Sequence, residues 1–226
     1  MSNKEKTWLG KIKELTEEVI IIVFAVSITL AFHNWNDERN ERKMEREFLA
    51  GVSSDLKAEA RNLGGSLADL NITANYYDTV WQQIISNKVD AAYIDSNSSQ
   101  LTNTLFFVFN SGRFEGFKSS GYLRLIENKK LLKHLTDLYI IAMPFQAHAD
   151  EMVYDSRRTD YNTYIGVKAP MDSKKIVHVS QILNDPAVRH QIVYYGGYLH
   201  ERIRQKTQLV ESMKKVADEI DKELEK

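Results

Sequence analysis

The sequence predicts an all-α protein in which an N-terminal transmembrane helix precedes a bundle or antiparallel hairpin of long helices. An uncharged apolar segment occupies residues 19–36 of a chain that is otherwise rich in charge. Two apolar stripes with heptad-like spacing follow, one beginning at Leu56 and the other at Val188. Only 3 prolines and 10 glycines occur among 226 residues, so long helices can run over most of the chain.

A short N-terminal tail, residues 1–18, leads into the predicted transmembrane helix at 19–36. A helix of this length spans about 27 Å, which matches the hydrocarbon core of a bilayer if Trp35 lies at the interface. A cleaved signal peptide and a buried soluble helix are the alternatives. Glu14 and Glu17 before the segment, and the lack of a small-residue cleavage site after it, argue against a signal peptide.

Flanking charge does not set the orientation of this segment, because basic residues are balanced across it. They are Lys4, Lys6, Lys11 and Lys13 on one side and Arg39, Arg42, Lys43 and Arg46 on the other. Long domains translocate largely regardless of such charges, so an exported C-terminal domain is allowed. The absence of cysteine fits either compartment.

Residues 37–226 form the predicted helical domain, and its first long helix covers about 37–87. The charged run from Asp37 continues the anchor helix outward. The apolar stripe that follows consists of Leu56, Ala60, Leu63, Leu67, Leu70, Ala74, Tyr77, Trp81 and Ile84. Gly64 and Gly65 fall inside it and predict a kink or a close helix crossing.

Central helices are predicted within about 100–165. Asn128 is a suitable N-cap and Pro144 a suitable stop for one of them, and an amphipathic stretch follows from Phe145 to Ile165. A long C-terminal helix, about 186–224, begins at Asp185-Pro186. Its stripe is Val188, Ile192, Tyr195, Leu199, Ile203, Lys206, Val210, Met213, Ala217, Ile220 and Leu224, in which only Lys206 is not apolar.

Both long stripes can be buried against each other and against the central segment. Parallel self-association into a coiled coil is the rival arrangement, so a homo-oligomer is possible on this pattern. The 30 basic and 31 acidic residues are interspersed, which provides no electrostatic surface for nucleic acid.

Two motifs resemble an uncharacterised family of small single-span membrane proteins found in Bacteroidota. The first is Glu18-Val19, the apolar run and Asn34-Trp35-Asn36-Asp37-Glu38-Arg39; the second runs from Phe117 through Lys-Ser-Ser-Gly121 to Asn128. His33 departs from the pattern, which would place a neutral amide or an aliphatic residue there. The resemblance implies a bacterial inner-membrane anchor with an exported, periplasmic helical domain, and it implies no activity.

Asn34, Trp35 and Asn36 are candidate partner contacts, because polar groups at the edge of the bilayer can hydrogen-bond between helices. An interfacial belt solvated by headgroups and water is the structural alternative. Ser119 and Gly121 are a second candidate contact, since a glycine turn can present backbone N–H groups to an anion. Here the alternative is a helix C-cap with Gly121 in the left-handed conformation.

Catalytic and cofactor motifs are missing from the sequence. His148, Glu151, Met152 and Asp155 could share a helical face, but no paired metal-ligand motif, phosphate-binding loop or dinucleotide fingerprint occurs. We therefore expect no enzyme, no cofactor and no metal.

The function expected from these observations is a non-enzymatic, membrane-anchored scaffold or accessory subunit of an envelope complex, which binds another membrane protein or itself. The alternative is a periplasmic ligand-sensing bundle that signals through a partner, with a pocket among Phe106, Phe109, Tyr139 and Tyr195.

Overall fold

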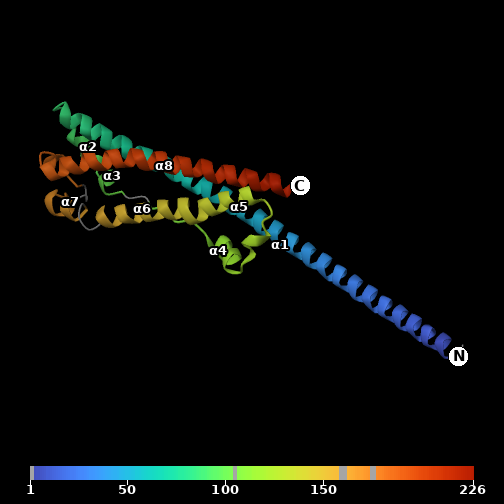
Figure 1. Cartoon of the computed structure of the whole chain (residues 1–226). Helices are drawn as coiled ribbons and strands as arrows, with labels where there is room; N and C mark the ends of the chain where they lie inside the picture. The colour runs from blue at the N-terminus through green and yellow to red at the C-terminus, as the bar shows by residue number, and fades with distance from the viewer. Residues whose placement is uncertain (1–2, 104–105, 158–161, 174–176) are drawn as a thin grey trace. The chain divides into compact units, whose positions relative to one another are not determined.

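The computed structural model of the protein describes residues 3–103, 106–157, 162–173 and 177–226, and it is all-α as predicted (Figure 1). The α-helices are α1 (Asn3–Ile85), α2 (Ala91–Ser96), α3 (Ser99–Thr102), α4 (Gly112–Ser119), α5 (Lys129–Thr136), α6 (Met143–Ser156), α7 (Asn162–Lys168) and α8 (Pro186–Leu224). Two 3-10 helices, η1 (Tyr122–Leu125) and η4 (Val179–Ile182), and a π-helix, η2 (Asp137–Ala142), complete the described elements.

The chain divides into two compact units, residues 1–48 and 49–226. In the first unit, α1 carries the apolar segment with its side chains exposed; Ile21 and Phe24, for example, are 67% and 66% exposed. Its most apolar window has a mean hydropathy of 2.1 and no buried residue. Among the described residues, α1 is therefore the one helix that is long and apolar enough to cross a membrane.

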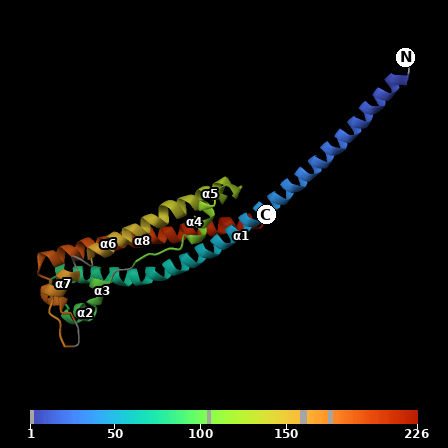
Figure 2. The ribbon, with the colours of Figure 1, turned by 90° about the horizontal axis from the view of Figure 1, so that it is seen from below.

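The second unit is a bundle of three long rods, formed by α1 from Leu49 onward, by α5–η2–α6 and by α8 (Figures 1 and 2). Helix α8 is antiparallel to α1: Ser53 Oγ donates to Asp221 Oδ1 at 2.6 Å, and at the opposite end the rings of Tyr77 and Tyr195 are 5.2 Å apart. The short helices α2, α3 and α7 close one end of the bundle (Figure 2).

Burial confirms both predicted stripes. In α1, Leu56, Ala60, Leu63, Leu70, Ala74, Tyr77 and Ile84 are buried, and Leu67 and Trp81 are partly buried. In α8, burial runs from Val188 to Ile220 and includes Lys206, which is 1% exposed. Each fully buried large aliphatic side chain stabilises the fold by about 1.5–3 kcal/mol, so the stripes supply much of the stability. The bundle arrangement is therefore internal to one chain.

Helix ends follow the predicted capping. The Asp185 side chain accepts from the backbone N–H of Ala187 at 2.9 Å, with Pro186 in the first turn of α8. The Asn128 side chain accepts from Leu131 N at 3.1 Å and starts α5. These side chains satisfy backbone donors that have no partner within the first helical turn.

The predicted close crossing at Gly64 and Gly65 is wrong, because α1 continues through them and a Cβ added at either would meet nothing within 4 Å. The close approach of α8 to α1 is at Gly196, where an added Cβ would lie 3.4 Å from Tyr77 Cβ. A glycine can be required for packing at one position and merely tolerated at another, and its flanking sequence does not distinguish the two.

The predicted helix stop at Pro144 is also wrong. The rod passes from α5 through the π-helix η2 into α6, with Pro144 in the first turn of α6. Proline lacks an N–H and its ring clashes with the carbonyl oxygen four residues earlier in an α-helix. The wider π turn just before Pro144 relieves this clash, so the rod continues where an ideal α-helix would end.

Candidate functional site

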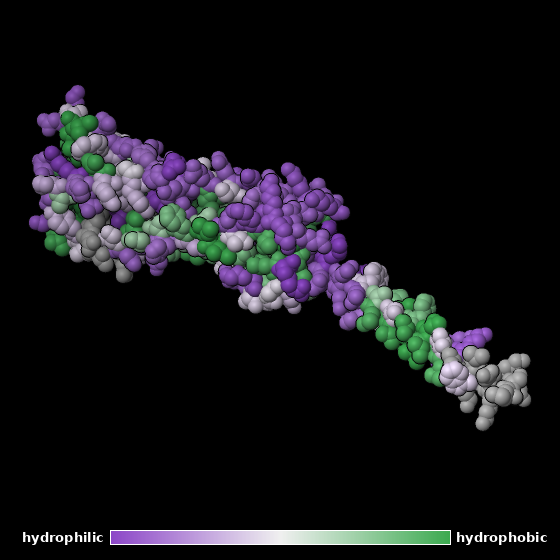
Figure 3. Space-filling model, viewed as in Figure 1, coloured by the Kyte–Doolittle hydropathy of each residue, from purple (hydrophilic) through white to green (hydrophobic). Residues whose placement is uncertain are grey.

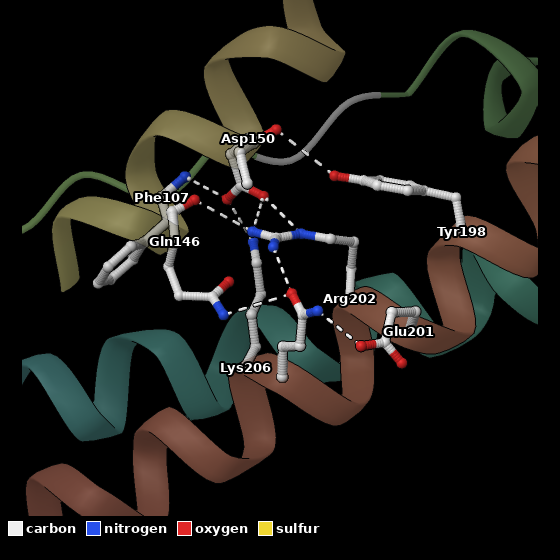
Figure 4. Close-up of polar contacts among 9 residues, drawn as sticks. Phe107, Gln146, Asp150, Tyr198, Glu201, Arg202 and Lys206 are labelled. Carbon is white, nitrogen blue, oxygen red and sulfur yellow. Dashed lines mark hydrogen bonds and ion pairs between the residues drawn. The ribbon is translucent and has the colours of Figure 1, made fainter. Parts of the chain in front are cut away.

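A buried ionic cluster joins α6 to α8 (Figure 4). The Asp150 carboxylate on α6 accepts from Arg202 Nη2 at 2.6 Å and from Lys206 Nζ at 2.6 Å. The two cations stand four residues apart on one face of α8, so both reach the same carboxylate. Asp150, Arg202 and Lys206 are 5%, 2% and 1% exposed.

Backbone and amide groups complete the hydrogen bonding of this cluster. The backbone N–H of Phe107 donates to Asp150 Oδ2 at 3.0 Å, and Arg202 Nη2 donates to the Gln146 carbonyl oxygen at 3.1 Å. Gln205 Oε1 accepts from Arg202 Nη1 at 2.7 Å, and Gln205 Nε2 donates to Glu201 at 2.6 Å. The cluster therefore fixes α6, α8 and the segment around Phe107 together.

Within this cluster, burial acts against the charged form of Lys206. Burial lowers the pKa of Lys206, and the carboxylate of Asp150 opposes that shift only in part. Burial likewise raises the pKa of the neighbouring Tyr198 to about 12, so its hydroxyl stays protonated and donates to the Ala149 carbonyl oxygen at 3.4 Å. The two buried cations, Arg202 and Lys206, share the single carboxylate of Asp150, so positive groups outnumber negative ones in the cluster.

A third buried cation, Arg157, lies between α1, α3 and α8. Its Nη2 donates to the Tyr77 hydroxyl at 2.9 Å and to the Leu101 carbonyl oxygen, and its guanidinium carbon is 3.5 Å from the centroid of the Tyr195 ring. Such stacking suits the flat, weakly hydrated guanidinium group. Arg157 therefore ties the end of the bundle together.

Beside the ionic cluster, a groove runs between α5–η2–α6 and α8. One hollow, of about 190 Å³, is lined in part by His134, Leu138 and Lys215. A second, of about 360 Å³, is lined in part by Phe145 and Gln146. The two share Ala142 and Ser212 as lining residues, so they adjoin, and we name them together the α6–α8 groove.

Three observations describe the groove and the rod that forms one of its walls. The π-helix η2 supplies part of its wall, and π turns within helices often occur at functional sites. The same rod carries three exposed apolar side chains, Ile141 (62% exposed), Phe145 (61%) and Met152 (61%). Figure 3 shows apolar side chains gathered over α6 on this face. Gln146 is 6% exposed, and among the described residues its Oε1 has no hydrogen-bond partner.

The residues predicted as partner contacts lie elsewhere. Asn34, Trp35 and Asn36 are exposed in the first unit, where Trp35 makes an edge contact with Phe32 and Arg39 lies 5.9 Å from its ring centroid. Gly121 has φ +73°, which confirms the left-handed cap after α4. The Ser119 hydroxyl donates to the Gly116 carbonyl oxygen at 3.1 Å, so this turn is internally bonded.

The four aromatic residues proposed as a ligand pocket each contact a different ring. Phe106 pairs with Tyr154, Phe109 with Phe107, Tyr139 with Phe114 and Tyr195 with Tyr77. His148 lies 3.7 Å from Glu151 on the exposed side of α6, and no cluster suited to a metal ion occurs within the described residues.

Asp150 and Arg202 were missed by sequence reasoning. Lys206 did carry a signal, as the single cation in an apolar stripe, but its carboxylate partner stands 56 residues earlier in the chain. Comparison of the chain with protein-family models, curated proteins and solved structures gives no match. A functional proposal must therefore be based on the residues themselves.

Proposed function

We propose that the protein is a non-enzymatic, single-pass membrane protein that serves as a scaffold or accessory subunit for another membrane protein of the bacterial envelope. In this proposal, residues 19–36 are the anchor in the inner membrane and residues 49–226 are a periplasmic helical domain. The resemblance of the Asn34-Trp35-Asn36 and Lys118-Ser119-Ser120-Gly121 motifs to the Bacteroidota family supports the same assignment.

The observation that carries the proposal is the exposure of the apolar segment of α1. Burying its side chains in lipid removes a large apolar surface from water, at about 25 cal/mol per Å². Helix α1 has all its internal backbone hydrogen bonds within the segment, as a lipid environment requires. The same helix then supplies the buried stripe of the bundle from Leu49 onward, so the anchor leads directly into the folded domain.

Cysteine labelling tests the anchor and its orientation, because the native chain contains no cysteine. Lys13→Cys and Asn75→Cys place single thiols at exposed positions on opposite sides of the apolar segment. In intact cells, a membrane-impermeant maleimide should label Asn75→Cys from the periplasm, whereas Lys13→Cys should react only after lysis. Labelling of both in intact cells, or release of the chain by alkaline carbonate, would refute the proposal.

Co-purification tests the partner. The C-terminally tagged full chain, isolated in mild detergent, should bring down another membrane protein at near-stoichiometric amounts by quantitative mass spectrometry. Trp35→Ala should reduce that recovery about tenfold, equivalent to about 1.4 kcal/mol of binding free energy. Trp8→Ala removes an exposed tryptophan on the other side of the segment and is the matched control. Recovery of the chain alone would contradict the accessory-subunit function.

A further inference from the structure

We infer that the Phe32–Trp35–Arg39 face of α1 binds a phospholipid, with the guanidinium group of Arg39 on the headgroup phosphate. The inference rests on the membrane anchor of the proposed function, and it adds a lipid ligand and a fixed depth to that anchor. The three residues follow one another at intervals of three and four positions, so they share one face of the helix. All three are exposed, Phe32 by 66% and Trp35 by 57%.

Each side chain of this face contacts the next. The rings of Phe32 and Trp35 meet edge to face with their centroids 6.2 Å apart, and Arg39 Cζ lies 5.9 Å from the Trp35 centroid. A guanidinium group held against an indole ring keeps the N–H donors at its edge free for an anion, because stacking consumes none of them. The indole therefore positions Arg39 without using its donors.

The charge of Arg39 is not matched within its own helix. The residues three and four positions away from it are Trp35, Asn36, Arg42 and Lys43. None of these is acidic, whereas Lys43 lies 3.8 Å from Glu47 one turn further on. Arg39 forms no ion pair with any residue that the structure describes. An exposed guanidinium group without a carboxylate is suited to a bidentate contact with a phosphate.

The order of the three side chains along α1 matches the layers of one leaflet. Phe32 belongs to the apolar segment, and an indole at the end of such a segment is typical of the edge of the hydrocarbon core. Arg39 is four residues beyond Trp35, a rise of about 6 Å. The polar layer on each side of a bilayer is about 5–7 Å thick, so Arg39 reaches the phosphates when Trp35 is at that edge. Figure 3 shows polar side chains bordering the apolar band of α1.

A phospholipid fits this face better than a protein helix does, because one molecule supplies an acyl chain for Phe32 and an anion for Arg39 in the required order. His33 and Asp37, 3.4 Å apart, lie on the opposite side of α1, since each residue turns the helix by about 100°. Polar groups at this depth favour contacts between helices, so the partner is expected on that side. Loss of the indole would let the anchor change depth and displace the polar side, which is how Trp35→Ala would weaken partner recovery.

Native mass spectrometry of the full-length chain in mild detergent tests the lipid site. The probes are dioleoyl phosphatidylglycerol and dioleoylglycerol, which have the same acyl chains and differ in the phosphate headgroup. The native chain should retain the phospholipid in preference. Arg39→Gln should weaken that retention about fivefold, the effect of about one cation at an anionic lipid surface.

Arg61→Gln is the matched control, because it removes an exposed arginine of the same helix within the bundle. It should leave the retention of phosphatidylglycerol unaltered. Equal retention of the two lipids by the native chain, or equal effects of the two arginine variants, would overturn the inference.

Quenching of Trp35 fluorescence by brominated phosphatidylglycerol tests the depth. Trp8→Phe and Trp81→Phe leave Trp35 as the single tryptophan, and circular dichroism checks the fold because Trp81 is partly buried. Bromines near the headgroup end of the acyl chains should quench the indole more than bromines near the methyl end, and Arg39→Gln should reduce this preference. Stronger quenching from the methyl end, or a preference that Arg39→Gln does not change, would contradict the inference.

Co-purification separates failure of this inference from failure of the proposed function. Phosphatidylglycerol retained through Arg39 by a chain without a protein partner would remove the accessory-subunit function and leave the lipid site standing. Partner recovery that is lost with Arg39→Gln while lipid retention is unchanged would assign the face to the partner protein and overturn the lipid site. Release of the chain by alkaline carbonate would remove both.

Discussion

Asp150 Oδ2 on α6 lies 2.6 Å from Lys206 Nζ on α8, and both residues are buried. Lys206 sits where the heptad pattern of α8 calls for an apolar side chain, and Asp150 is the compensation for that exception. Because Arg202 reaches the same carboxylate from one turn away, removing Asp150 would leave two buried cations without a counter-charge.

Asp150→Asn should therefore lower the free energy of unfolding by about 3–5 kcal/mol, the usual effect of removing one partner from a buried ion pair. Because asparagine has nearly the same size as aspartate, the loss of stability would come from charge and hydrogen bonding and not from packing. Urea denaturation followed by circular dichroism measures it. Asp218→Asn, at an exposed position of α8, should change stability by less than about 0.5 kcal/mol. Similar losses in the two variants would contradict the role of the cluster.

Lys206→Met should change how stability depends on alkaline pH. Burial lowers the pKa of Lys206 below its ordinary 10.5, so between the lowered pKa and 10.5 the unfolded chain binds more protons than the folded one. The native protein therefore becomes more stable as pH rises across that window. At a pH below the lowered pKa this additional stability is absent. The methionine variant lacks it.

The test is the difference in unfolding free energy between native protein and Lys206→Met, measured from about pH 8 to about pH 11. Tyrosine ionisation is common to both proteins and cancels in this difference to first order. The native protein should gain on the variant as pH rises. A difference that does not vary with pH would show that Lys206 titrates at its ordinary value.

Stability at acid pH depends in part on Asp221, which lies near the C-terminal end of α8. Two hydrogen bonds lower the pKa of Asp221 below 3.8. The larger effect comes from Lys57 Nζ, which donates at 2.5 Å, and the smaller from Ser53 Oγ, which donates at 2.6 Å. This contribution to stability is present above pH 3.8 and is lost as pH falls through the lowered pKa. Asp221→Asn should reduce the slope of the stability curve in that window and leave its alkaline limb unchanged, as acid titration of the unfolding free energy would show. An unaltered acid limb would contradict the coupling.

The sequence was sufficient for the fold class, the two long stripes and the caps at Asn128 and Asp185, because these depend on local spacing and on backbone hydrogen bonds within a single turn. It was insufficient for the α6–α8 groove, which depends on how η2 passes Pro144 and on which residues of α8 face it. The pairing of Asp150 with Lys206 is likewise a tertiary contact, and an isolated aspartate on α6 resembles any solvated one.

Gly121 and Gly116 form a matched pair that separates backbone strain from packing, since an added Cβ would meet nothing within 4 Å at either position. Gly121 has φ +73°, where a side chain costs about 1–2 kcal/mol, so Gly121→Ala should destabilise the bundle by that amount. Gly116 lies within α4, where alanine is preferred to glycine by about 0.5–1 kcal/mol, so Gly116→Ala should stabilise it. Opposite shifts in the midpoint of thermal unfolding would establish the left-handed cap as the reason for the glycine, whereas shifts of the same sign would contradict it.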